Sequence, residues 1–308
     1  MTKLISLSSL ALALLAQSSF ALSLPLPDVQ MTKEQYRTLV PTTETQEFTP
    51  VNFRAIVALS NCSGSLVRFQ NSKLTDAAMV LTNGHCNENG FVDAGKAVQN
   101  IPSHRRFGLL SDSGSNLTTL HANLIMFGTM TGTDITLYRL EETYEDLKNK
   151  FGVQPLVISS KRPAVQDPIT IVSGYFKSKF ACHIDAFIYK MKEDQWTWRD
   201  SIRYSQPGCE TGHGTSGSPI INSDTYEIVG INNTGNDDGA KCTMDNPCEI
   251  DQDGKITVRK HASYGQETYW IYGCLTQDRQ IDINISGCQL NPTVKDSRRA
   301  LKSYPVRR

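Results

Sequence analysis

The stretch 209-CETGHGTSGSP-219 places Ser216 among three glycines and a terminal proline. Glycine loses more conformational freedom on folding than any other residue, so three glycines within six positions need a physical reason. One reason is that backbone N–H groups must point at a developing negative charge with no side chain in the way. The stretch therefore predicts either a tight turn that presents the Ser216 hydroxyl beside an oxyanion hole, or a surface loop between two strands.

The composition gives no electrostatic basis for binding nucleic acid or an anionic membrane. The chain has 308 residues, and its 31 lysines and arginines balance 31 aspartates and glutamates. Net charge therefore predicts neither partner. A chain of this length can form two domains or one large β domain. The basic run at 297–308 belongs to an expected solvated tail over residues 291–308.

The first residues predict export. Lys3 precedes the apolar run 4-LISLSSLALALLA-16, and Ser19-Phe20-Ala21 has the small-x-small form of a cleavage site. We expect residues 1–21 to be a signal peptide and the mature chain to begin at Leu22. The alternative is an N-terminal anchor, but the run is short for a membrane span. The expected location is extracellular or periplasmic, with no membrane contact after cleavage.

Eight cysteines in an oxidising compartment predict up to four disulfides. Two pairs are close in sequence and would close short loops: Cys242 with Cys248, and Cys274 with Cys288. The pairing of the other four cysteines stays open at this point: Cys62, Cys86, Cys182 and Cys209. No CxxC or His pair stands at metal-ligand spacing, so no metal is expected.

The rest of the chain predicts an all-β fold, either a sandwich or a barrel. Residues 22–50 are polar and contain prolines, which indicates a propeptide or an N-terminal arm. From Phe53 onward, short β-branched and aromatic runs alternate with turns. The expected strands lie within 55–59, 64–69, 78–82, 134–140, 169–175, 184–191, 219–222 and 227–232. One helix is expected over 141–151, and a break near Phe151 divides the strands into sets at 51–150 and 151–290.

A base and a carboxylate that could activate Ser216 stand at the ends of two expected strands. His85 closes the strand in 79-MVLTNGHC-86, and Asp134 opens the strand in 132-GTDITLYRL-140. A serine hydroxyl is a weak nucleophile until a neutral imidazole takes its proton. A buried carboxylate then fixes the imidazole tautomer and stabilises the imidazolium. Taken singly, the histidine could be a turn residue and the aspartate a strand cap.

These motifs together resemble those of the trypsin/chymotrypsin-fold serine endopeptidases. The resemblance covers roughly residues 53–275 and keeps the order His, Asp, Ser. Three of its segments are similar to the family's VLTAAHC, NDIALLKL and GDSGGP motifs: 80-VLTNGHC-86, 133-TDITLYRL-140 and 211-TGHGTSGSP-219. Two more resemble the family's cysteine-glycine-serine-leucine strand and the strand that pairs with substrate backbone: 62-CSGSLV-67 and 228-IVGINNTG-235.

The resemblance implies roles for individual residues. Ser216 would be the nucleophile, His85 the general base and then acid, and Asp134 the group that orients His85. The N–H groups of Gly214 and Ser216 would form the oxyanion hole. The residues expected to hold substrate on the later strand are Asn233, Thr234 and Gly235.

The resemblance also implies the architecture and two disulfides. We expect two antiparallel six-stranded β-barrels with the active site in the cleft between them. Cys62 would pair with Cys86, and Cys182 with Cys209. The expected protein is a monomer that acts on protein or peptide substrates and needs no cofactor.

Two departures point to the secreted bacterial branch of this family. Thr215 stands where mammalian digestive enzymes carry the aspartate that pairs with a new N-terminus, and no RIVGG-like activation site precedes the first strand. Thr215 and Ser218 resemble more closely the secreted bacterial branch, which includes glutamyl endopeptidases with GNSGSP. If residues 22–50 inhibit the enzyme, we expect them to do so by occlusion.

The sequence leaves the substrate preference open between two classes. Glu210 lies six residues before Ser216, where trypsin-like enzymes hold a pocket aspartate, which predicts cleavage after Arg or Lys. Thr211 and His213 suggest instead a pocket for an acidic side chain. The histidine that glutamyl endopeptidases use on the later strand has no match here, so a basic preference is favoured.

Three function hypotheses follow. The first is a secreted serine endopeptidase that works through an acyl-enzyme intermediate. The second is a catalytically inert binding module or adhesin on the same fold, and the third is an unrelated disulfide-rich β protein.

Overall fold

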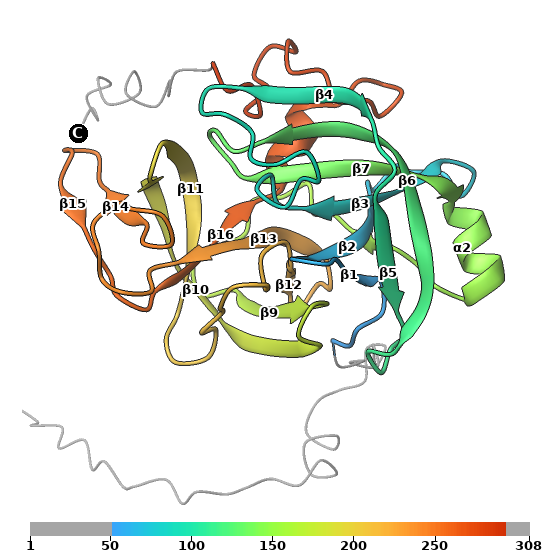
Figure 1. Ribbon diagram of the computed structural model, residues 1–308, viewed down its shortest axis with the longest axis horizontal. Coiled ribbons are helices and arrows are strands. Elements are labelled where there is room, and N and C mark those ends of the chain that lie inside the picture. The colour runs from blue at the N-terminus through green and yellow to red at the C-terminus, as the bar shows by residue number, and fades with distance from the viewer. Residues whose placement is uncertain (1–50, 294–308) are drawn as a thin grey trace, which may run out of the picture. The chain divides into compact units, whose positions relative to one another are not determined.

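The structure, a computed structural model, describes residues 51–293 and consists mainly of antiparallel β-strands (Figure 1). The expected signal peptide, the N-terminal arm at 22–50 and all but three residues of the basic tail lie outside the described residues. Among residues 51–293, no helix is long and apolar enough to cross a membrane.

The first sheet closes into a six-stranded antiparallel barrel. Its strands pair in the order β1-β5-β6-β7-β3-β2, and β2 returns to β1. The strands are β1 (Ile56–Ala58), β2 (Ser63–Arg68), β3 (Ala77–Thr82), β5 (Arg106–Leu110), β6 (Asn116–Thr129) and β7 (Ile135–Thr143). Two further strands extend the sheet: β4 (Ala97–Pro102) on β6, and β8 (Leu156–Val157), parallel to β2.

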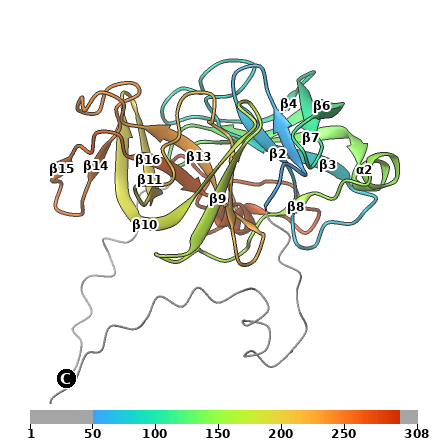
Figure 2. The same cartoon turned by 90° about the horizontal axis from the view of Figure 1, so that it is seen from below.

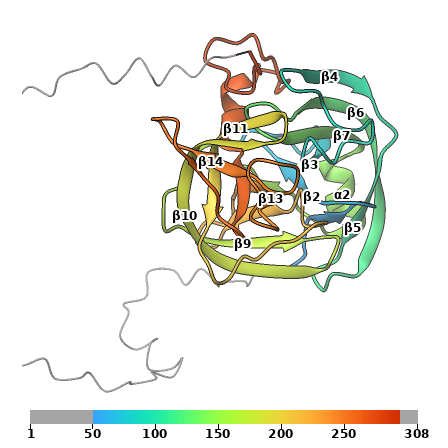
Figure 3. The ribbon, with the colours of Figure 1, turned by 60° about the vertical axis from the view of Figure 1, so that its left-hand side comes forward.

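The second sheet closes in the same way. Its strands pair in the order β11-β16-β13-β12-β9-β10, and β10 returns to β11. The strands are β9 (Pro168–Ser173), β10 (Ser178–Glu193), β11 (Trp196–Tyr204), β12 (Pro219–Asn222), β13 (Ile228–Gly235) and β16 (Ser263–Glu267). The hairpin of β14 (Cys248–Ile250) and β15 (Ile256–Thr257) continues the sheet beyond β10 (Figure 3). The predicted fold of two six-stranded antiparallel barrels is confirmed.

The apolar strands of the first barrel are buried on both faces because they serve two cores. In β3, Ala78 and Val80 belong to the core inside the barrel. Met79 and Leu81, which point to the opposite face of the strand, belong to a second core shared with β13 and the segment after β16. A strand buried on both faces reads as a continuous apolar run, which is why 78–82 stands out in the sequence.

The helix after β7 is shorter than the sequence predicts. α2 spans Tyr144–Phe151, and the expected start at Glu141 is wrong because β7 continues through Thr143. Thr143 caps the helix: its side chain accepts a hydrogen bond from the N–H of Asp146, and the Asp146 carboxylate accepts one from the N–H of Thr143. This capping box fixes the first turn one residue after the strand ends. Figure 2 shows α2 beside the first barrel, away from β10 and β14.

Four disulfides join the eight cysteines, and none of the cysteines in residues 51–293 is free. The pairs are Cys62–Cys86, Cys182–Cys209, Cys242–Cys248 and Cys274–Cys288. The first ties the start of β2 to the turn after β3, and the second ties β10 to the loop that carries Ser216. The last closes the segment after β16, which contains the short 3-10 helix η1 (Tyr269–Cys274).

Candidate active site

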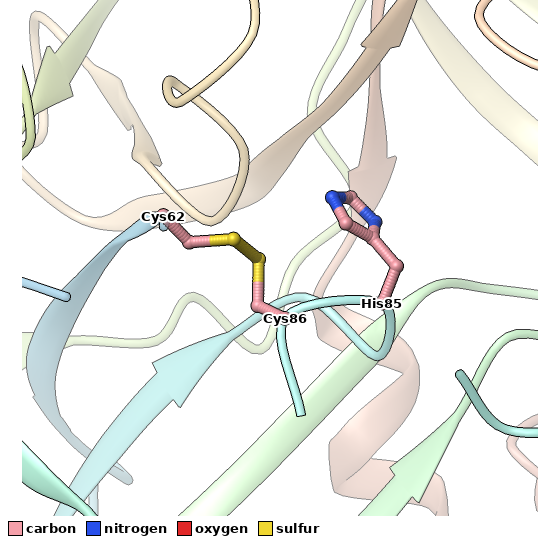
Figure 4. Close-up of side chains that lie close together, drawn as sticks. All are labelled: Cys62, His85 and Cys86. Atoms are coloured by element: carbon pink, nitrogen blue, oxygen red, sulfur yellow. A yellow bond between two sulfur atoms is a disulfide. The ribbon is translucent and has the colours of Figure 1, made fainter. Parts of the chain in front are cut away.

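His85 sits on a tight turn at the end of β3. Gly84 allows this turn, because a Cβ at that position would lie 2.1 Å from the carbonyl oxygen of Thr129. The Asn83 side chain donates to the Asp134 carbonyl at 2.8 Å, which holds the turn against the start of β7. Figure 4 shows the imidazole of His85 beside the Cys62–Cys86 disulfide.

Asp134 is fully buried and is hydrogen-bonded to His85 twice. Its Oδ1 accepts from the His85 backbone N–H at 3.0 Å, and its Oδ2 lies 2.8 Å from His85 Nδ1. Burial lowers the pKa of His85, but the charge and hydrogen bond of Asp134 outweigh that effect. Glu193 and Asp245 add to the attraction, so the pKa of His85 lies above its ordinary value.

The loop that carries Ser216 is fixed between the two barrels. The Ser63 N–H of β2 donates to the Ser216 carbonyl at 2.7 Å, and the Gly217 N–H donates to the Asn232 carbonyl of β13 at 2.9 Å. Gly217 has a φ of 82°, and a Cβ there would lie 2.1 Å from the Ser63 carbonyl oxygen. Only glycine fits this conformation and this approach to β2.

The backbone N–H groups of Gly214 and Ser216 have no hydrogen-bond partner among the described residues. Gly214 has a φ of 87°, which turns the chain immediately before Thr215. Both residues line the cavity described below, so these two donors are available to a ligand there.

The Ser216 hydroxyl donates to the Asn233 carbonyl of β13 at 3.1 Å. Among the hydrogen bonds of the described residues, none joins this hydroxyl to His85. Ser216, His85 and Asp134 nevertheless line one cavity of about 290 Å³. The arrangement therefore brings the expected nucleophile and base to one cavity with the hydroxyl turned toward β13.

The cavity wall contains most of the residues that the sequence analysis proposed for substrate binding. These are Thr211, His213, Asn233, Thr234 and Gly235. Glu210 is the exception. It does not line this cavity, contrary to the expectation that it forms the pocket floor. Its carboxylate is exposed and accepts from the Gly208 N–H at 3.1 Å, because the short loop after Gly208 brings the two groups together.

His213 is an exposed part of the wall. Its Nε2 lies 2.7 Å from an Asp237 carboxylate oxygen, and its Nδ1 lies 3.9 Å from one of Asp245. The hydrogen bond with Asp237 raises the pKa of His213 above its ordinary value. His213 is therefore engaged with acidic groups of this chain at the position where the sequence suggested a contact with an acidic substrate.

Sequence reasoning missed one buried acid of this wall, Glu193 at the end of β10. Its side chain accepts from Thr234 Oγ1 and from the Asp245 N–H, each at 2.8 Å. Burial raises the pKa of Glu193 to about 7. The sequence offers little signal for it, since Glu193 and Asp194 read as the polar turn of a hairpin.

One cluster of possible metal ligands gathers within the described residues: Cys62, His85 and Cys86. Both sulfur atoms are joined in the disulfide, as Figure 4 shows, so neither is available as a thiolate. Metal binding at this cluster is therefore not supported.

Comparison with known proteins shows that a family model, described as the trypsin-like peptidase domain, matches residues 62–231. No curated protein matches the sequence. The matched range contains His85, Asp134 and Ser216.

Solved structures with a similar chain path include three bacterial or extremophile proteins. The MamO protease domain of Magnetospirillum magneticum is 12% identical, with a TM-score of 0.45 over 73% of this chain and 97% of its own. A thermostable serine protease from an extremophilic microorganism is 16% identical, with a TM-score of 0.41 over 69% and 88%. The chymotrypsin of Cellulomonas bogoriensis is 14% identical, with a TM-score of 0.38 over 70% and 90%.

Proposed function

The chain belongs to the trypsin-like peptidase family of serine endopeptidases, and from this premise we propose that it is a secreted enzyme whose Ser216, His85 and Asp134 cleave peptide bonds through an acyl-enzyme. The observation that carries the proposal is the fully buried Asp134 carboxylate, 2.8 Å from His85 Nδ1, in one cavity with Ser216.

The proposed first step begins with a rotation of the Ser216 side chain. Ser216 Oγ leaves the Asn233 carbonyl and turns to the Nε2 of His85, whose other nitrogen is held by Asp134. As Oγ attacks the substrate carbonyl carbon, the Oγ–H proton passes to Nε2, and the carbonyl oxygen becomes an oxyanion. The buried carboxylate of Asp134 stabilises the imidazolium that forms.

In the next steps the oxyanion and the leaving group each interact with a group of this chain. The N–H groups of Gly214 and Ser216 donate to the oxyanion. The tetrahedral species collapses when His85 Nε2 gives its proton to the leaving amine, which breaks the C–N bond and leaves an ester on Ser216. A water molecule, deprotonated by His85, hydrolyses the ester and restores the enzyme. These steps are complete without a cofactor.

Two further observations support the cellular part of the proposal. Four disulfides are typical of proteins that fold in an oxidising compartment. Residues 1–21 have the pattern of a signal peptide. We propose that the protein acts outside the cytoplasm.

Burst kinetics test the proposed chemistry. With an activated p-nitrophenyl ester, the wild-type protein should release one equivalent of nitrophenol rapidly and then turn over slowly, because acylation outruns hydrolysis of the ester on Ser216. Mass spectrometry should find the acyl group on the peptide that contains Ser216, and Ser216→Ala should show neither burst nor adduct. A folded wild-type protein that gives no burst, or an adduct elsewhere, would contradict the proposal.

A further inference from the structure

The carboxylate of Glu193 is buried in the wall of the active-site cavity, with no cation beside it except histidines. Glu193 is 5% exposed, and the cavity lining in the described residues contains no lysine or arginine. Its acidic neighbour Asp245 adds a second negative charge rather than a compensating positive one. A carboxylate removed from water without a paired cation is unfavourable by several kcal/mol.

The structure nevertheless holds this carboxylate in place. Thr234 Oγ1 donates to one oxygen and the Asp245 N–H donates to the other, each at 2.8 Å. A carboxylate has about four acceptor positions, so roughly two remain for a further donor. Because Thr234 lies on β13, the strand proposed to hold the substrate, that donor can come from the substrate.

The walls around Glu193 suit the apolar stem of a long side chain. Phe91, Trp196 and Trp198 line the cavity, and the Phe91 ring lies edge-on to Trp196 at 5.5 Å. The indole N–H of Trp196 donates to the Val92 carbonyl, and that of Trp198 donates to the Met130 carbonyl, each at 2.9 Å. Both rings are therefore fixed, and each can pack on an aliphatic stem or a guanidinium.

A second observation also points to a polar ligand at this cavity. Asn233 lines the same cavity and is 3% exposed, yet neither polar atom of its side chain has a hydrogen-bond partner in residues 51–293. Buried amides are almost always hydrogen-bonded, so this one requires an explanation. A bound substrate can provide the missing groups.

We propose that Glu193 is a specificity-determining residue that pairs with the guanidinium or ammonium group of a substrate arginine or lysine close to the scissile bond. The inference rests on the proposed function, and it assigns to Glu193 the role that the sequence gave to Glu210. The fixed aromatic walls select length, and the buried carboxylate selects positive charge.

Binding of a small cation tests the assignment without depending on catalysis. The probe is butylguanidinium, which has an arginine-like head and stem, titrated by calorimetry into the full-length protein carrying Ser216→Ala. Adding Glu193→Gln should weaken binding by about 10- to 100-fold, the range for a hydrogen bond to a charged group. Glutamine can still accept from the Asp245 N–H, and the Thr234 hydroxyl can reverse to accept from its amide, so the fold should persist.

Three comparisons make the outcome decisive. Glu210→Gln, a surface carboxylate outside the cavity, should leave binding unchanged, and Glu193→Asp should retain part of it because the charge remains. No binding to the Ser216→Ala protein, or equal binding after Glu193→Gln, would overturn the inference. Failure of the proposed function would show separately, as an absent ester burst in protein that still binds butylguanidinium.

Discussion

At the scale of single residues, the pKa of His85 is set by opposing effects. Burial disfavours the imidazolium, whereas Asp134 favours it by charge and hydrogen bond, with smaller contributions from Glu193 and Asp245. The net shift is upward. Since the neutral imidazole is the base, kcat/KM for a neutral substrate should rise with pH, with a midpoint above 6.5.

Asp134→Asn reverses the balance at His85. Burial is then opposed only by the smaller attractions of Glu193 and Asp245, so the midpoint of the acidic limb should fall below that of the wild type. The rate should also fall by roughly 10⁴-fold, because the amide no longer holds the required tautomer or stabilises the imidazolium. The measurement is a pH profile of kcat/KM with a neutral peptide, so that ionisation of Glu193 does not enter through substrate binding.

Asp112→Asn is the control for this experiment. Asp112 is an exposed carboxylate paired with Arg54 at 3.0 Å, and its loss should leave the profile unchanged. If Asp134→Asn leaves the midpoint where it is in the wild type, Asp134 does not set the pKa of the catalytic base.

At the scale of elements, the loop before β12 requires glycine at position 217 but not at position 212. At Gly217 the backbone has a φ of 82°, and a Cβ would lie 2.1 Å from the Ser63 carbonyl oxygen and 2.3 Å from Thr82 Oγ1. Gly217→Ala should destabilise the protein by about 1–3 kcal/mol. It should also slow acylation of Ser216, because the loop must withdraw from β2.

Gly212→Ala offers a matched control in the same loop. A Cβ at Gly212 meets nothing within 4 Å, so stability should change by no more than about 0.5 kcal/mol. Urea unfolding and the ester burst measure the two effects. Equal behaviour of the two alanine variants would show that the approach of the loop to β2 does not position the nucleophile.

Elements were predictable from the sequence where their residues are apolar or carry a motif. The runs at 78–82 and 219–222 correspond to β3 and β12. By contrast, β16 reads as the polar string SYGQE, although all five of its residues are buried. Its burial follows from pairing with β11 and β13, which no local pattern reveals.

The candidate site likewise contains residues that the sequence could predict and one that it could not. His85, Asp134 and Ser216 could be proposed because each lies in a local motif beside a strand end. Glu193 could not, because its place beside Thr234 depends on how the β10–β11 hairpin packs on β13. The assignment to Glu210 failed because an offset along the chain transfers a role only if the loop has the same length and path.

At the scale of the whole described molecule, the proposed chemistry depends on contacts between the barrels. His85 and Asp134 belong to the first barrel and Ser216 to the second. The barrels meet at the Ser63–Ser216 backbone hydrogen bond and in a shared apolar core. The segment after β16 adds two ties: Arg279 pairs with Asp76 at 2.8 Å, and Arg199 donates to the Gln289 carbonyl at 2.9 Å.

The central claim is that these contacts make Ser216 a nucleophile activated by His85. The most direct measurement is the rate of labelling of the exported protein by a fluorophosphonate, with peptide mapping of the adduct. We expect the label on Ser216 alone, no label after Ser216→Ala, and labelling about 10²- to 10⁴-fold slower after His85→Ala, the range for loss of a general base. Labelling of folded wild-type protein that is absent, or equally fast without His85, would contradict the account.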